Sequence, residues 1–224
     1  MYFYSPTYLF IMIAGLVLGF GTQAWINSAY KKWSRVPLVT GRSGAEVARM
    51  MLDENGLQGV AIEQITGKLT DHYDPRARVL RLSEGVYQGR SIASAGVAAH
   101  EAGHAVQHAR AYAPAALRQA LVPAANIGSQ LSGVLVLAGF FLNASGLIAI
   151  GAWVFFAMVV FQIVTLPVEF DASRRAVAAL SNGLPPEQVS GARAVLTAAA
   201  MTYVAAALIS IMNFLYYLGL SRRN

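Results

Sequence analysis

The sequence predicts a mainly α-helical membrane protein, with four transmembrane helices and a small α+β region outside the membrane. Its composition is one reason, because 56% of the 224 residues are hydrophobic and only 12% are charged, about half the charged share of a typical soluble domain. A second reason is that three long runs contain no charge: residues 1–30, 119–168 and 194–221. These features argue against an ordinary soluble enzyme and against a disordered chain.

The uncharged runs predict where the chain crosses the membrane. A helix needs roughly 20 residues to cross the hydrocarbon core, so the first and last runs can each hold one span. The middle run can hold two spans joined by a turn at residues 143–146, Asn-Ala-Ser-Gly. A cleaved signal peptide is the alternative for the first run, but residues 1–10 lack the Lys and Arg of such peptides. The expected spans are residues 7–27, 122–142, 147–167 and 197–219.

The basic residues predict the orientation and the partners. Of 17 Lys and Arg residues, 12 lie between the first two expected spans and three lie between the last two. The positive-inside rule places these segments in the cytoplasm, and the lipid bilayer is the first expected partner. Topology accounts for the net charge of +6, and the sequence has no nucleic-acid recognition motif, so no nucleic acid is expected to bind. The lack of cysteine excludes disulfides and thiolate metal sites.

The polar segments are residues 31–118 and 168–193, and we expect them to form one polar region. We further expect residues 1–224 to fold as a single membrane-embedded unit. The hydrophobic periodicity and the turn residues predict the elements of the first polar segment. The expected elements are helices over residues 45–52 and 91–111, strands over residues 60–62 and 79–83, and a turn over residues 71–75.

A metal-binding motif lies on the second of these helices. Residues 100–104, His-Glu-Ala-Gly-His, have the pattern H-E-x-x-H. Residues four apart share a helix face, so His100 and His104 can bind one metal ion while Glu101 acts as general base. With four His and seven Glu in the chain, roughly 0.002 chance occurrences are expected. The alternative is an ordinary polar helix surface, which the small and apolar neighbours of the motif disfavour.

A catalytic zinc site normally takes a third protein ligand and keeps one position open. His72 is one candidate. Glu169 is the better one, because it is the first charge after residues 119–168 and the expected hairpin returns the chain towards the motif helix. His108 continues the four-residue series and is expected to contact solvent or a ligand rather than the metal. Asp171 is expected either to orient a ligand histidine or to pair with an arginine.

Several segments resemble a known family. Residues 72–75 (HYDP), 79–87 (VLRLSEGVY), 90–93 (RSIA) and 96–108 (GVAAHEAGHAVQH) are similar to the YugP-like neutral zinc metallopeptidases of bacterial membranes. The resemblance implies a multi-pass protein of the bacterial inner (cell) membrane that is a Zn²⁺-dependent peptidase. It also implies the ligands His100, His104 and Glu169, with Glu101 as the catalytic base.

A more distant resemblance is to the HtpX and Ste24 membrane peptidases. In these enzymes a helix with an E-F-x-A-D type motif supplies the ligand Glu. Here the corresponding stretch is Glu169-Phe-Asp-Ala-Ser173, so Ser173 stands where that pattern has Asp. This departure leaves open whether Asp171 replaces the carboxylate that normally supports a ligand.

The expected function is that of a zinc metalloendopeptidase, which hydrolyses peptide or membrane-protein substrates at the cytoplasmic membrane face. One alternative is a site-2-type intramembrane protease, whose motif lies inside a span. Another is a non-enzymatic, zinc-stabilised membrane adaptor with His72 or His108 closing the site.

The identity of the metal and the remaining groups of the site are less well determined by the sequence. Two His and a carboxylate would also suit iron, and the sequence does not indicate the oligomeric state. Candidate groups for stabilising the oxyanion are His72, Tyr73 and Arg175, and strand 79–83 could pair with substrate if it is an edge strand.

Overall fold

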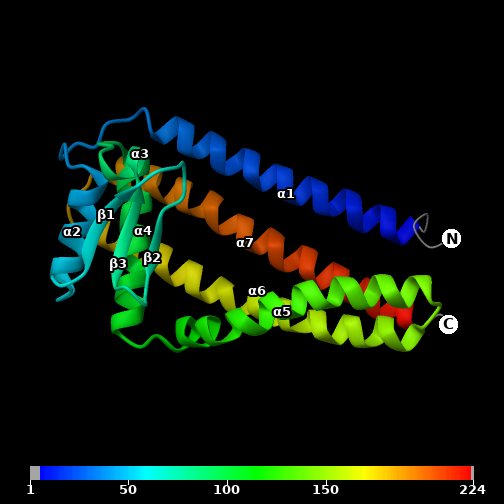
Figure 1. Cartoon of the computed structure of the whole chain (residues 1–224). Helices are drawn as coiled ribbons and strands as arrows, with labels where there is room; N and C mark the ends of the chain where they lie inside the picture. Colours follow the sequence, from blue (N-terminus) through cyan, green and yellow to red (C-terminus); the bar gives the residue numbers. More distant parts are fainter. Residues whose placement is uncertain (1–5, 223–224) are drawn as a thin grey trace. The chain divides into compact units, whose positions relative to one another are not determined.

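The computed structural model describes residues 6–222, and the chain is mainly helical (Figure 1). Within these residues, four helices are long and apolar enough to cross a membrane. The four predicted spans fall on these four helices, apart from the last residue of the second span, so this part of the prediction is confirmed. The four helices are α1 (Pro6–Trp33), α5 (Ala113–Phe141), α6 (Ser145–Ser181) and α7 (Pro186–Ser221).

Helix α6 continues well beyond the span predicted at residues 147–167. The following sequence is rich in Ala and Arg, which favour helix, and Pro167 is accommodated inside the helix. Residues 169–173 therefore lie on a helix rather than in a loop. The turn before α6 is also shorter than predicted, because Ser145 already begins the helix and Asn143 turns the chain with φ 50°. Asn is among the few residues that readily adopt this left-handed conformation.

The chain folds as two compact units. One unit comprises Met1–Gln23, Ala116–Leu166 and Met201–Asn224, and the other comprises Ala24–Ala115 and Pro167–Ala200. The first unit holds an apolar cluster that includes Ala152, Val159 and Phe214. The second unit holds the strands, the short helices and the H-E-x-x-H segment. That the whole chain forms one membrane-embedded unit stays a prediction.

The second unit contains a three-stranded sheet with the order β1-β3-β2. Strand β3 (Val79–Ser83) lies in the centre, parallel to β1 (Ala61–Ile65) and antiparallel to β2 (His72–Asp74). The strand predicted at residues 79–83 is confirmed, and the strand predicted at residues 60–62 lies instead at Ala61–Ile65. The turn predicted at residues 71–75 is wrong, because its middle residues form β2. Since β3 is paired on both sides, it is also not the edge strand that could receive a substrate.

Besides parts of α1, α6 and α7, the second unit contains three shorter helices: α2 (Gly44–Glu54), α3 (Glu84–Tyr87) and α4 (Ile92–Ala109). Helix α2 begins with a capping box, in which the side chains of Ser43 and Glu46 each accept a backbone N–H. Helix α4 presents small residues on most of its surface, so it packs closely against its neighbours in the core. The predicted helices at residues 45–52 and 91–111 are confirmed, and α3 was not predicted.

Candidate metal centre

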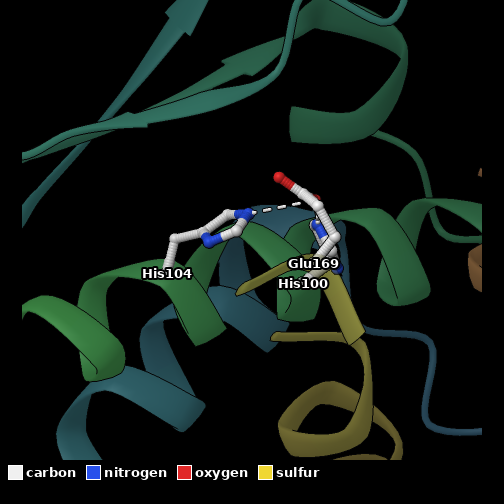
Figure 2. Close-up of side chains that lie close together, drawn as sticks. All are labelled: His100, His104 and Glu169. Atoms are coloured by element: carbon white, nitrogen blue, oxygen red, sulfur yellow. Dashed lines mark hydrogen bonds and ion pairs between the residues drawn. The ribbon is translucent and has the colours of Figure 1, made fainter. Parts of the chain in front are cut away.

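The two motif histidines lie on one face of α4 and meet a carboxylate from α6 (Figure 2). Nε2 of His100 is 3.2 Å from Oε2 of Glu169, and Nε2 of His104 is 3.6 Å from the same oxygen. Glu169 is only 2% exposed. The four-residue spacing thus brings both imidazoles to one point, as predicted, and Glu169 rather than His72 joins them there.

The close approach of α4 and α6 depends on a glycine between the two histidines. A Cβ atom built on Gly103 would lie 2.9 Å from the carbonyl oxygen of Ala172 and 3.2 Å from its Cα. A larger residue at position 103 would therefore push the helices apart. Ala172 follows Glu169 by three residues, so both residues lie on the face of α6 that meets α4.

Each histidine also uses its second ring nitrogen. Nδ1 of His100 lies 3.1 Å from Oγ of Ser173, so Ser173 makes a direct contact in the place of the usual Asp. Nδ1 of His104 lies 3.0 Å from Oε1 of Gln107. An amide oxygen only accepts hydrogen bonds, so Nδ1 of His104 is the donor. Both rings are therefore held by Nδ1, and both turn Nε2 towards Glu169.

Asp171 pairs with arginines, which is one of the two expected alternatives, and its link to a ligand histidine runs through Gln107. Its Oδ2 accepts a hydrogen bond of 2.9 Å from Nε2 of Gln107 and another of 2.6 Å from Nε of Arg175. Its other oxygen accepts a hydrogen bond from Arg174. Asp171 thus pairs with two arginines and also contacts the amide that holds His104. Arg175 is paired with this carboxylate.

The donor set fits a zinc ion. One ligand atom from each of His100, His104 and Glu169 lies within 4.8 Å of the other two. Two zinc ligands at bond lengths of about 2.1 Å and a tetrahedral angle are about 3.4 Å apart, which is close to the 3.2 Å and 3.6 Å measured to Glu169. A neutral His104 that donates from Nδ1 also presents the lone pair of Nε2 to a carboxylate. Two such groups repel each other, and a shared cation would remove the repulsion.

Glu101 follows the first histidine on α4 and is partly buried. Burial raises the pKa of Glu101, while charge on His100 and His104 acts in the opposite direction. Burial alone would lower the pKa of His104, but the neighbouring carboxylates of Glu169 and Glu101 raise it overall. The carboxylates and imidazoles therefore interact strongly at this site, a pattern typical of functional centres.

The other two histidines lie outside this group. His72 is exposed, and its Nδ1 lies 2.9 Å from the carbonyl oxygen of Thr70. His108 is also exposed, and its Nδ1 lies 3.0 Å from the hydroxyl of Tyr73. In the part of the chain that the structure describes, the group that could hold a metal ion contains neither of them. The expectation that His108 contacts solvent rather than the metal agrees with this arrangement.

Sequence reasoning missed Gln107. Its side chain is only 1% exposed, although glutamine is rarely fully buried without partners. The sequence feature that could have identified Gln107 as a partner of His104 was its position, three residues later on the same helix face. Its partners on α6 could not be found in this way, because they are more than sixty residues further along the chain.

Comparison with known proteins agrees with the metal-binding geometry. Residues 8–222 match the family described as "Putative neutral zinc metallopeptidase". A curated relative from Bacillus subtilis (strain 168), described as "Putative membrane protease YugP", is 47% identical over 212 residues, which cover 94% of each chain. No solved structure matches the chain significantly. The chain therefore belongs to the neutral zinc metallopeptidase family that the resemblance indicated.

Proposed function

We propose that this chain is a zinc-dependent endopeptidase that cleaves protein substrates at the cytoplasmic face of the bacterial inner membrane. His100, His104 and Glu169 would hold the zinc ion, and Glu101 would be the general base. The observation that carries the proposal is the meeting of both Nε2 atoms with one buried carboxylate oxygen, at 3.2 Å and 3.6 Å. The family and the relative described as a membrane protease support the same activity.

The chemistry divides between the metal and Glu101. When bound, zinc supplies a Lewis acid that activates water and polarises the scissile carbonyl. Glu101 accepts a proton from the attacking water and then delivers it to the nitrogen of the leaving amine. A base with a raised pKa suits the first step, because it accepts the proton from water more readily. In the second step it can release that proton on one condition, which is that the leaving amine is the stronger base. The leaving amine meets this condition, since free amines are far more basic than carboxylates.

The proposed location rests on the charge distribution and on the four apolar helices. Fifteen of the 17 Lys and Arg residues lie in the two segments that hold the candidate site, and such segments stay in the cytoplasm. Glu169 follows directly after the uncharged residues 119–168. Substrates close to the membrane surface, including membrane proteins, are the class that this position would favour.

The two alternative functions have less support. A site-2-type protease carries the motif inside a span, but within residues 6–222 helix α4 is not among those long and apolar enough to cross a membrane. A structural zinc site in an adaptor normally has four protein ligands. The group described here offers three, which leaves a position for water or substrate.

Replacing Glu101 by Gln tests the proposal most directly. The purified, zinc-loaded protein in detergent would be incubated with a panel of unfolded and membrane-derived polypeptides, and cleavage would be followed by mass spectrometry. We expect Glu101→Gln to abolish cleavage while zinc stays bound, because the amide cannot accept the proton. Glu187→Gln is the matched control, since Glu187 is exposed and lies at the start of α7. Undiminished cleavage by Glu101→Gln would overturn the assignment of the base.

A further inference from the structure

We infer that Gln107 is a positioning residue, which Asp171 holds in one orientation so that it fixes the proton of His104 on Nδ1. This inference rests on the proposed function, because it concerns how one of the proposed zinc ligands is prepared. In many zinc sites a single carboxylate orients the ligand histidine. Here we infer that an amide and a carboxylate perform this task in series.

The first step is the orientation of the Gln107 amide. Its nitrogen lies 2.8 Å from the carbonyl oxygen of Val168 and 2.9 Å from Oδ2 of Asp171. Both partners are acceptors, so both require the NH₂ group of the amide. The opposite orientation would place the amide oxygen against two acceptors inside the core, where unsatisfied polar groups are costly. The chemistry of its partners therefore determines which end of the amide faces His104.

The second step is the tautomer of His104. The end that remains is Oε1, which lies 3.0 Å from Nδ1 of His104. Because Oε1 can only accept, a neutral His104 carries its proton on Nδ1 and leaves the lone pair of Nε2 free. That lone pair faces Glu169 at 3.6 Å. A metal ligand needs this unprotonated nitrogen, so Gln107 prepares His104 for binding before the metal arrives.

The third step is the strength of the support behind Gln107. Asp171 is 3% exposed and is also paired with Arg174 and Arg175. The two guanidinium groups lie directly against this carboxylate, and a hydrogen bond to a carboxylate is stronger than one to a neutral acceptor. Gln107 and His104 lie on α4 while Asp171 lies on α6, so the same contacts also join the two helices that carry the ligands.

The first test measures the affinity of the full chain in detergent for zinc alone, by competition with a chromophoric chelator. Gln107→Met keeps the length of the side chain and removes its hydrogen bonds, and we expect a loss of about 10- to 100-fold in affinity. Gln58→Met is the control, because it makes the same replacement at an exposed glutamine whose amide bonds the carbonyl oxygen of Asp53, and its zinc affinity should equal that of the wild type. Wild-type affinity in a folded Gln107→Met variant would overturn the inference.

A second pair of variants keeps the inference testable if Gln107→Met folds poorly. Gln107→Glu retains the shape but places a carboxylate against Asp171, so it should bind zinc weakly. Adding Asp171→Asn restores a donor that faces the new carboxylate, and the double variant should bind zinc more tightly than Gln107→Glu alone. A double variant as weak as Gln107→Glu would show that the two residues do not act as a pair.

A spectroscopic measurement distinguishes positioning from a merely structural role. The chain has four histidines, so ¹⁵N-histidine spectra of the metal-free protein can be assigned by single replacements. Wild-type His104 should be the tautomer with its proton on Nδ1. In Gln107→Met the proton should move to Nε2, where it can donate to Glu169. An unchanged tautomer would contradict the inference.

Glu169→Ala separates this inference from the proposed function. If Glu169→Ala leaves zinc binding unchanged, the proposed ligand set itself is wrong. If Glu169→Ala weakens zinc binding but Gln107→Met does not, the ligand set stands and only the role of Gln107 is wrong.

Discussion

Gly103 of α4 packs against the backbone of Ala172 of α6 so closely that a Cβ on Gly103 would lie 2.9 Å from the carbonyl oxygen of Ala172. This contact brings the histidines of α4 to the carboxylate of α6. It gives the second variable position of the H-E-x-x-H segment a steric role, independent of the chemistry of its neighbours.

Replacing Gly103 by Ala should therefore disturb the site. Ala favours a helix more than Gly does, but the added methyl group must displace backbone, and overpacking of this kind costs about 1–3 kcal/mol. We expect Gly103→Ala to lower both thermal stability and zinc affinity. Gly96→Ala is the control on the same helix, because a Cβ there meets its nearest atom at an ordinary 3.4 Å. Equal zinc affinity in the two variants would contradict this role.

Removing the hydroxyl of Ser173 should weaken zinc binding. Its Oγ is the partner of His100 Nδ1 at 3.1 Å, and the loss of such a contact typically costs about tenfold or more in metal affinity. Ser181→Ala is a suitable control, since Ser181 lies further along α6 and bonds only to the carbonyl oxygen of Val177 among the contacts described. Chelator competition gives the two affinities, and wild-type affinity in Ser173→Ala would show that His100 is oriented by other contacts.

The histidines outside the site should be dispensable for metal binding. His72 and His108 are both exposed and contact Thr70 and Tyr73 instead of the ligand group. We expect the double variant His72→Ala/His108→Ala to keep wild-type zinc affinity in the same competition experiment. A drop of tenfold or more would indicate a fourth protein ligand, and with it the closed structural site of the adaptor alternative.

The sequence was sufficient where the determining interactions are local or where topology restricts the outcome. The face shared by His100 and His104 follows from helix periodicity. The position of Glu169 near the motif helix follows from the predicted helical hairpin, because the two ends of a hairpin lie close together. The four long helices follow from runs without charge, which need no knowledge of tertiary contacts.

The sequence was insufficient where the outcome depends on contacts between distant segments. Strand β2 contains Asp and precedes Pro75, which are typical of turns, but pairing with β3 keeps it extended. The role of Gln107 depends on acceptors from α6, and that of Gly103 depends on how closely α6 approaches. Ser173 could be recognised as a departure from a motif, but only the structure shows that it contacts His100 directly.

Binding of one zinc ion by His100, His104 and Glu169, with one position left open, is the basis of the proposed function. Elemental analysis and X-ray absorption of the purified protein, beside Glu169→Ala, test it most directly. We expect one zinc per chain bound by two imidazoles, one carboxylate and one oxygen from solvent, with much weaker binding in Glu169→Ala. Four protein ligands, or binding and coordination unaffected by the loss of Glu169, would contradict it.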